Sequence, residues 1–378
     1  MHATRNTRWR LATTLSLVAL IAMGLAACGA GGGGTAAGGN NGKGCKHVAF
    51  LLPESATAAR WEAADHPDVD AAIKQYLPGA TVDAPNAQGN ASNQQTQAES
   101  ELSKGACILV VAPVDSTASA AIVAKAKASG VPVIAYDRLI YSDDLNYYAS
   151  FDGFAVGKAQ GQYIADHYQQ YVTQNGTNNA IMINGSDTDN NAHLFGNGAH
   201  SVLDPLFQGG KLNKVYEQFT PGWDNATAQT EAEAALTQAN NKIAVAYVMN
   251  DGMANTVIAA LKAHNLNGKV LVTGQDAEVS GIRNILLGDQ SMTVYKPIKK
   301  LADSVGRLVA AISNGQDTAS IATAKVKNPS GNAQVPSVLN AVVEVDISNI
   351  KTTVIADGFV SVADVCQGVP SGAGGVCP

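Results

Sequence analysis

From residue 46 onward, short apolar runs alternate with longer amphipathic stretches. Each apolar run has the length and β-branched content of a buried strand, and each amphipathic stretch has the spacing of a helix with one buried face. In the first half the predicted elements are HVAFLL, a helix over 58–76, TVDAP, a helix over 92–104, CILVVAP, a helix over 116–129, PVIAYD and YYASFD. This order is typical of an α/β fold with helices on both faces of a parallel sheet.

The same alternation resumes after a predicted helix over 156–171. The later apolar runs are NAIMING, KVYEQF, IAVAYVMND, KVLVTGQD and MTVYKP. About 335 residues follow the N-terminal segments, which is more than one hydrophobic core usually serves. We therefore predict two Rossmann-like α/β domains, each built on a parallel sheet.

Polar side chains follow nearly every predicted strand. In open α/β sheets, ligands bind beyond the carboxyl ends of the strands, so these side chains are candidates for function. They are Asp115, Asp137, Arg138, Asp152, Asn191, Asn250, Asp251, Asp276 and Lys296. The pattern brings carboxylates, amides and cations together at one edge of each sheet.

The stretch NGSDTDNNAHLF raises the alternative of a calcium loop. Asp187, Asp189 and Asn191 match the first half of the EF-hand pattern. The sharp-turn position, however, is Ala192 instead of glycine, and the twelfth position, which should be an acidic ligand, is Gly198. We therefore expect no metal here, and we expect Asp189 or Ser186 to cap the following helix.

Enzymatic chemistry finds little support in the sequence. It contains no G-x-S-x-G or H-E-x-x-H motif, and its longest glycine cluster lies in the N-terminal tract. His193 is expected to be a solvated or capping residue. The remaining Asp, Asn, Arg and Lys side chains suit vicinal hydroxyls, because carboxylates accept and cations and amides donate. Trp61 and Trp223 are either core residues or plates that cover the apolar faces of a pyranose.

Residues 1–27 have the features of a lipoprotein signal peptide. Three arginines precede an apolar run over 11–22, and LAAC ends at Cys28. This ending resembles the lipobox, in which the cysteine is lipidated and becomes the new N-terminus; a chance cysteine in an ordinary secretion signal is the alternative. The Gly-rich residues 28–44 are expected to form a flexible tether.

Charge and cysteine content fit an exported chain. Cleavage before Cys28 would remove three of 25 basic side chains and none of the 31 acidic ones, leaving a formal net charge of −9. This charge disfavours nucleic acid and anionic lipid as partners.

Four further cysteines are expected to form disulfides, and they allow three pairings. Cys45 and Cys107 precede apolar strands that, as neighbours, would bring them about 5 Å apart, whereas Cys366 and Cys377 bracket a short C-terminal segment.

Seven motifs together resemble the pentose- and hexose-binding proteins of ABC transporters. They are ARW, AYDRLI, YYASFD, NGSDTDNNAHLF, GWDNATAQ, GQDA and MTVYKP, in order between about residues 46 and 362. The likeness is strongest to the xylose-binding members, with the multiple-sugar-binding members next. It implies a type I periplasmic binding protein fold and ten ligand-binding residues: Arg60, Trp61, Asp137, Arg138, Asp189, Asn191, Trp223, Asn250, Asp276 and Lys296.

Some motifs depart from the xylose pattern, so the sugar stays open among xylose, arabinose, glucose and galactose. The first loop reads ESATAARW instead of an Asp-rich sequence, and GWDNATAQ leans toward the multiple-sugar relatives.

The resemblance also implies the organisation of the chain. Three crossings would join the domains, near Asp152, near Lys296 and near 323–327. The expected parts are a first lobe over 45–152 plus about 297–323, a second lobe over 153–296 plus about 324–362, and a tail over 363–378.

The expected function is that of a monomeric lipoprotein on the outer face of the cytoplasmic membrane. It would bind a monosaccharide without a cofactor and deliver it to an ABC transporter permease. The alternatives are a sensory receptor that signals to a kinase or chemoreceptor, a sugar-responsive repressor and an enzyme. A repressor would need an N-terminal helix-turn-helix where the lipobox stands, and an enzyme would need a nucleophile with its base or a metal set.

Overall fold

The computed structural model describes residues 41–378. The predicted signal peptide, the lipidation residue Cys28 and nearly all of the predicted tether lie outside this part of the chain. None of the helices within residues 41–378 is long and apolar enough to cross a membrane.

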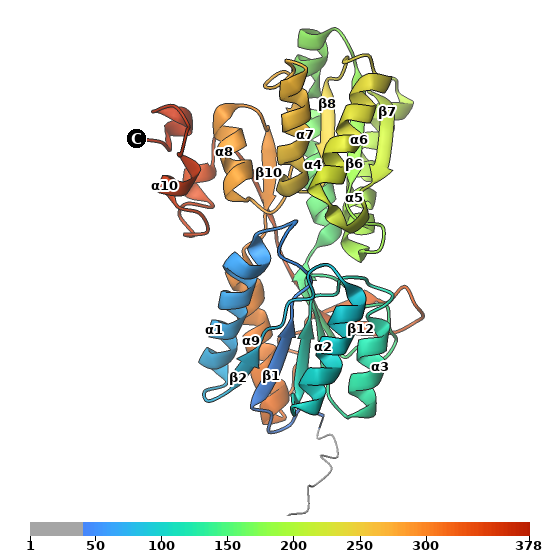
Figure 1. Cartoon of the computed structure of the whole chain (residues 1–378), viewed down its shortest axis with the longest axis vertical. Coiled ribbons are helices and arrows are strands. Elements are labelled where there is room, and N and C mark those ends of the chain that lie inside the picture. The colour runs from blue at the N-terminus through green and yellow to red at the C-terminus, as the bar shows by residue number, and fades with distance from the viewer. Residues whose placement is uncertain (1–40) are drawn as a thin grey trace, which may run out of the picture. The chain divides into compact units, whose positions relative to one another are not determined.

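A seven-stranded sheet forms the centre of what we call the first lobe (Figure 1). In spatial order its strands are β11 (Ala324–Lys327), β12 (Gln334–Asn340), β5 (Tyr147–Phe151), β4 (Val133–Tyr136), β3 (Ile108–Val111), β1 (His47–Leu51) and β2 (Thr81–Asp83). All neighbours are parallel except β11 and β12. The parallel strands end at one edge, as the sequence pattern predicted.

Helices cover both faces of this sheet. One face carries η1 (Trp61–Asp65), α1 (His66–Tyr76) and α9 (Ile298–Asn314), and the other carries α2 (Ala91–Ser103) and α3 (Ala120–Ala128). Val48 and Phe50 pack with α1 and α9, whereas Ala49 and Leu51 pack with α2 and α3. Because successive strand residues point to opposite faces, a strand buried on both sides reads as a continuous apolar run.

The second lobe is built on a second parallel sheet. Its strands are β7 (Asn213–Phe219), β6 (Asn179–Asn184), β8 (Val245–Val248) and β9 (Leu271–Val272), and a bridge between Gln275 and Val294 continues it to β10 (Met292–Tyr295) and β13 (Val343–Asp346). Its helices are α4 (Gly153–Asn175), α5 (Asn190–Gln208), η2 (Pro221–Trp223), α6 (Asn225–Gln238), α7 (Asp251–Ala263) and α8 (Val279–Leu287).

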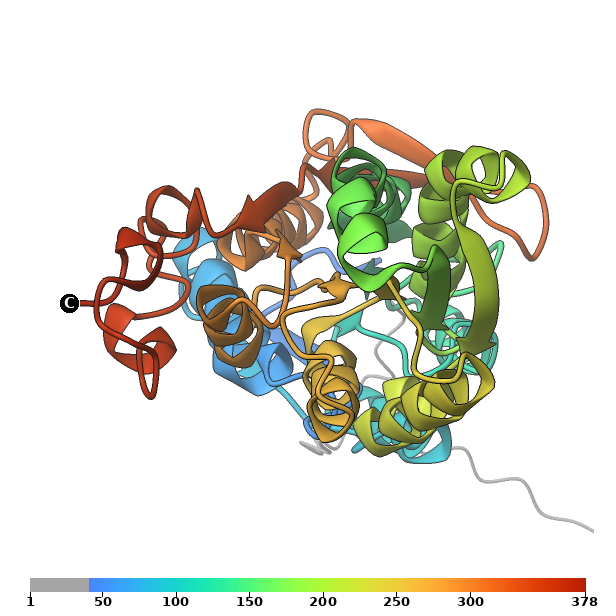
Figure 2. The same cartoon turned by 90° about the horizontal axis from the view of Figure 1, so that it is seen from above.

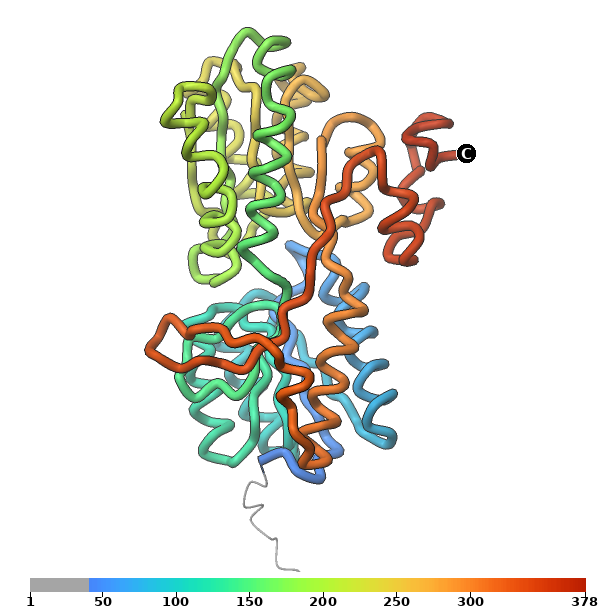
Figure 3. Tube along the Cα trace, turned by 180° about the vertical axis from the view of Figure 1, so that it is seen from behind, coloured from blue at the N-terminus to red at the C-terminus, as the bar shows by residue number. Residues whose placement is uncertain are grey.

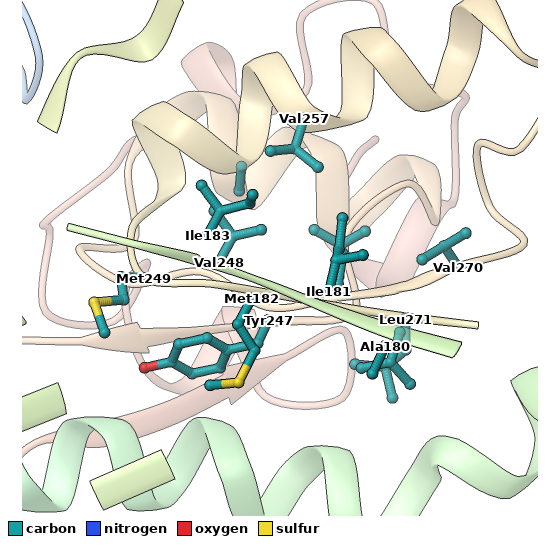
Figure 4. Close-up of a cluster of buried hydrophobic side chains, with 14 of the residues drawn as sticks. Ala180, Ile181, Met182, Ile183, Tyr247, Val248, Met249, Val257, Val270 and Leu271 are labelled. Atoms are coloured by element: carbon teal, nitrogen blue, oxygen red, sulfur yellow. The ribbon is translucent and has the colours of Figure 1, made fainter. Parts of the chain in front are cut away.

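The core of the second lobe lies on both faces of its sheet. The helices α4 and α7 lie on opposite sides of these strands (Figure 2). Ile183 points toward Val257 of α7, whereas Met182 and Tyr247 point to the opposite face (Figure 4). The predicted fold class, two α/β domains, is confirmed, because each sheet has its own buried core.

The chain passes between the two sheets three times (Figure 3). The passages lie at Asp152, at 296–297 and at 341–342, between consecutive elements of different sheets. The expectation that the third passage lies near 323–327 is wrong. Strands β11 and β12 belong to the first lobe, since β12 pairs with β5 from Ser337 to Asn340. The partner of a strand depends on backbone pairing, which the strand's own residue pattern does not specify.

Two disulfides form as the sequence suggested. Cys45 and Cys107 join the entry points of the neighbouring strands β1 and β3, with Cα atoms 5.4 Å apart. Cys366 and Cys377 form the second disulfide, in the C-terminal segment. The helices of this segment are η3 (Ile350–Thr352), α10 (Val362–Val365) and η4 (Ala373–Gly375). This segment packs against α8 through a buried apolar cluster and is therefore a folded part of the second lobe.

The close approach of α4 and α5 yields a stability prediction. A Cβ atom on Gly157 of α4 would lie 1.7 Å from the carbonyl oxygen of Phe195 on α5. We expect Gly157→Ala to separate the helices and to lower the free energy of unfolding by about 1–3 kcal/mol, as overpacking does. Chemical denaturation measures this change.

Gly196→Ala is the matched control on α5. Its Cβ atom would meet the Met249 side chain at 3.5 Å, an ordinary contact. Because alanine is the better helix former, this variant should keep or slightly raise the stability. Equal stability of the two variants would contradict the packing argument.

Candidate ligand-binding site

The structure brings all ten residues of the expected binding set together around one small cavity. The cavity volume is about 20 Å³, little more than one water molecule needs. Its full lining is Ala58, Arg60, Trp61, Asp137, Arg138, Asp189, Asn191, Phe195, Trp223, Asn250, Gln275, Asp276 and Lys296. Both lobes contribute side chains, mostly from the loops and helix starts that follow the parallel strands.

Three of these residues have unusual backbone conformations. Asp137 follows β4, Trp223 ends η2 and Asp276 follows β9, and their φ angles are 60°, 58° and 94°. Non-glycine residues rarely adopt positive φ, and such strain concentrates at functional sites because the surrounding structure must hold it. At Asp137 the hydroxyls of Tyr148 and Ser150 donate to the backbone oxygen at 3.0 and 2.6 Å.

Arg60 is the centre of the charge network. Its guanidinium donates to both oxygens of Asp65 at 2.8 and 2.7 Å, a bidentate pair inside the first lobe. Its remaining nitrogen donates to Asp137 at 3.1 Å and to Asp276 of the second lobe at 3.2 Å. Burial lowers the pKa of Arg60, but the charges of Asp137 and Asp65 outweigh it and raise the pKa well above its ordinary value. Arg60 is therefore a fixed cation shared by three carboxylates.

Asp137 is held ionised by cations and an amide from both lobes. Burial would raise its pKa, but the charges of Arg60 and Lys296 dominate and hold it well below its ordinary range. The Lys296 ammonium lies 3.4 Å from Asp137 and 3.1 Å from Asp276. The side-chain amide of Asn191, in the second lobe, donates to the Asp137 carboxylate at 3.1 Å. A carboxylate in this state accepts hydrogen bonds and does not donate them.

The stretch NGSDTDNNAHLF supplies a second carboxylate at the start of α5. Asp189 caps this helix, as the sequence suggested: its carboxylate accepts a hydrogen bond from the backbone N–H of Asn191 at 2.9 Å. Its other oxygen lies 2.9 Å from Nε of Arg138 in the first lobe and accepts from the Trp223 indole at 3.1 Å. Burial raises the pKa of Asp189, which the charge of Arg138 opposes.

Two tryptophans border the cavity from different lobes. Trp61 is buried in the first lobe, and the guanidinium carbons of Arg60 and Arg138 lie 4.6 and 5.2 Å from its ring centre. Trp223 is buried in the second lobe, where a Cβ atom on Gly185 would lie 2.1 Å from its ring. Gly185 is thus required by the ring position of Trp223.

The remaining polar residues of the stretch lie off the cavity. Asp187 and His193 are exposed, and the His193 ring contacts the Asp187 carbonyl at 2.8 Å. Asn190 instead contacts the first lobe: its backbone amide donates to Ser116 and its side chain accepts from Tyr141, both at 3.1 Å. Asn190 therefore belongs to the contact between the two lobes.

Sequence reasoning missed several residues of the site. Asp65 and Tyr136 lie behind Arg60, and the Tyr136 hydroxyl donates to Asp65 at 2.6 Å. Nothing in the sequence separates Asp65 from the other acids of its helix. Phe195 and Gln275 line the cavity. Phe195 follows Asn191 by four residues on α5, so helical spacing could have indicated that the two share a face.

The lining is suited to a neutral polyhydroxylated ligand. It contains three carboxylates, three cations and three amides, and none of its residues is Ser, Thr, Cys or His. A hydroxyl donates one hydrogen bond and accepts others, so it can contact a carboxylate and a cation at the same time. The geometry supports binding and offers no nucleophile paired with a base.

Two α/β lobes with a charged cavity at their strand ends define a two-lobed binding protein. Residues 48–317 match the model of the periplasmic binding protein domain. The chain is 39% identical to the D-xylose-binding periplasmic protein of Escherichia coli over 281 residues, which cover 74% of this chain and 82% of that protein. It is 36% identical to the multiple sugar-binding periplasmic protein SbpA of Azospirillum brasilense over 82% of this chain and 89% of that protein.

Solved structures agree with these relatives. A carbohydrate transporter solute binding protein from Chloroflexus aurantiacus, in complex with D-glucose, has a TM-score of 0.73 and 32% identity, over 84% of this chain and 97% of that one. An ABC transporter solute binding protein from Clostridium phytofermentans with bound β-D-glucose has a TM-score of 0.72 and the same identity, over 85% and 100%. The chain belongs to the periplasmic binding protein family and, like these relatives, is not an enzyme. The expected type I fold is confirmed.

Glu278 of the second lobe lies beside this network. It borders a neighbouring cavity of about 260 Å³, which Arg60 and Ala59 of the first lobe and Asp276 also line. Burial, with a contribution from the charge of Asp276, raises the pKa of Glu278 from 4.5 to about 7. The folded protein therefore holds this proton more tightly than the unfolded chain does.

This pKa predicts how stability depends on pH. Because the folded-state pKa is the higher one, the stability linked to Glu278 is present at pH 4.5 and below and is lost as the pH rises to about 7. We expect a loss of about 1 kcal/mol, less than the full shift would give, because the side chain is still partly exposed. Denaturant unfolding at pH 5 and pH 8 measures it.

Glu278→Gln isolates this effect. The variant should lose less stability than the unmodified protein between the two pH values, while the exposed Glu99→Gln control should keep the original difference. An unchanged pH dependence in Glu278→Gln would remove Glu278 as its origin.

Proposed function

We propose that this protein is the sugar-binding component of an ABC importer, which takes xylose or a related aldopyranose between its lobes. The observation that carries the proposal is the sharing of carboxylates and cations between the lobes. Arg138 of the first lobe contacts Asp189 of the second at 2.9 Å, and Arg60 contacts Asp276 at 3.2 Å. Each of these groups can instead contact a sugar hydroxyl.

The relatives support this choice of ligand. The Escherichia coli protein is a D-xylose-binding protein, and the two solved structures hold D-glucose. The chain spans most of the length of each. Trp61 and Trp223 supply rings for the apolar faces of a pyranose, each worth about 1 kcal/mol beyond burial.

Ligand uptake requires the lobes to move. A cavity of about 20 Å³ is far smaller than a monosaccharide, so the lobes must separate or rotate around the three passages. The sugar then replaces the direct contacts between the lobes with contacts that both lobes make to it. A ligand shared in this way stabilises the closed form by its differential affinity for that form. The closed form is the one we expect a membrane permease to recognise.

The N-terminus completes the proposal. Cleavage before Cys28 and lipidation of this cysteine would anchor the protein to the outer face of the cytoplasmic membrane. The Gly-rich residues 28–44 would leave the lobes free to move at the surface. Periplasmic relatives support export of the chain.

A thermal-shift panel tests the ligand class. With xylose, arabinose, glucose, galactose and ribose present in turn, we expect xylose or glucose to raise the melting temperature most, because a ligand bound only by the folded state stabilises it. Calorimetric titration of the best sugar against Asp276→Ala should show affinity weaker by about tenfold or more, since Arg60 and Lys296 lose a buried partner.

Asp187→Ala is the matched control, because Asp187 is an exposed aspartate near the cavity that does not line it. It should bind the sugar as the unmodified protein does. If none of the five sugars shifts the melting temperature, the ligand class is wrong; if Asp276→Ala binds normally, Asp276 is not a binding residue.

Lipidation of Cys28 has a direct test. In bacterial cells the unmodified chain should sediment with membranes, and Cys28→Ser should not, because the lipid is attached to the thiol. Mass spectrometry of the mature N-terminus identifies the modification. Recovery of an unmodified N-terminus from the original chain would disprove the anchor.

A further inference from the structure

A second cluster of ligating side chains lies at the start of β1, away from the carboxyl strand ends that form the cavity. His47 is the first residue of β1, Asp83 is the last residue of β2, and Glu101 lies in the last turn of α2. One ligand atom from each lies within 4.8 Å of the others. Nε2 of His47 is 3.0 Å from Oδ2 of Asp83 and 3.8 Å from Oε2 of Glu101.

Glu101 gives this cluster an unsatisfied buried oxygen. The residue is only 3% exposed, and its Oε1 accepts from Lys104 at 2.8 Å. Its Oε2 is buried and accepts no hydrogen bond from any residue in the range 41–378. A buried carboxylate oxygen without a donor is costly. This oxygen faces His47, where a cation bound by the ring would also contact it.

The cluster has the donor set and spacing of a transition-metal site. Ligand atoms that share a tetrahedral zinc ion at 2.0–2.2 Å lie about 3.3 Å apart, and the two distances from His47 fall on either side of this value. One imidazole and two carboxylates suit Zn²⁺, whereas Ca²⁺ and Mg²⁺ need more oxygen ligands. We propose that His47, Asp83 and Glu101 bind one Zn²⁺ or a similar first-row divalent ion, with water as the fourth ligand.

Other histidine and carboxylate groups in the described chain do not converge in this way. His66 contacts Glu62 alone, at 3.1 Å. His200 contacts Asp204 through Nδ1 and Glu217 through Nε2, so its two carboxylates lie on different sides of the ring. Within residues 41–378, only the cluster at His47 places a ring nitrogen and two carboxylates around a common point.

A metal here would have a structural role. It would tie β1, β2 and the end of α2 together, next to the disulfide that already joins β1 to β3 at Cys45 and Cys107. His47 begins β1, whereas the sugar cavity lies beyond the carboxyl ends of the strands. The ion should therefore stabilise the first lobe and leave sugar binding unchanged, so the proposal does not depend on the sugar.

Zinc titration of the full chain tests this site. The sample is untagged protein with Cys28→Ser, which removes the thiol outside the two disulfides. It is first treated with EDTA to remove bound metal ions. Calorimetry with ZnCl₂ should show one site per chain, and zinc should raise the melting temperature. Both His47→Gln and the more exposed Asp83→Asn should weaken zinc binding by about tenfold or more.

His66→Gln is the matched control, because it removes a histidine that contacts one carboxylate at a similar distance. It should bind zinc with unchanged affinity. The zinc-induced change in melting temperature is compared within each variant, so a variant that is merely less stable does not imitate loss of the site. Absence of saturable zinc binding, or equal affinity in His47→Gln, would show an ion-paired triad only and overturn the proposal.

Discussion

The arrangement of the binding cavity depends on one cation, the guanidinium of Arg60. A buried arginine needs partners for its donors, and this one contacts three carboxylates: Asp65 within its own lobe, Asp137 at the cavity, and Asp276 of the second lobe. Asp65 fixes the plane of the guanidinium by a bidentate contact and is itself held by Tyr136. The third guanidinium nitrogen, Nη1, then has a fixed direction, which determines where the carboxylates of Asp137 and Asp276 lie. Without this fixed positive charge, the buried carboxylates of Asp137 and Asp276 would share Lys296 as their remaining close counter-ion.

In the second lobe, the buried carboxylate of Asp189 likewise requires hydrogen-bond donors and a counter-ion. Asp189 caps α5, and its other oxygen accepts from Trp223 and lies against Arg138 of the first lobe. Several residues that join the lobes, among them Asp189 and Arg138, thus also line the cavity. Groups with exchangeable hydrogen bonds are suited to a ligand that donates and accepts, because one partner can replace another at modest net cost. One set of side chains can therefore contact either the other lobe or a ligand with hydroxyl groups.

The fold class and most of the cavity could be predicted from local pattern. Residues that follow parallel strands must meet at one edge, so the positions of Asp137, Asp276 and Lys296 along the chain are enough to predict that they lie together. The pairing of Cys45 with Cys107 followed from the same adjacency. The roles of Asp65 and Glu278 could not be predicted, because each depends on burial by segments distant in sequence. The strands β11 and β12 were assigned to the wrong lobe for a similar reason, since their place in the first sheet depends on the pairing of β12 with β5, which is distant in sequence.

The sequence by itself determined the alternation of strands and helices, the polar strand ends and the family. Periodicity and turn chemistry are local, and seven ordered motifs are specific enough to identify a relationship. Only the tertiary structure decided which lobe β11 and β12 join, which carboxylates share Arg60, and that Glu278 shares a cavity with Arg60 of the first lobe. These properties arise from burial and from contacts between residues such as Arg60 and Asp276, which are more than two hundred positions apart. Charge and hydrogen bonding act through space, so their partners are fixed only when the chain has folded.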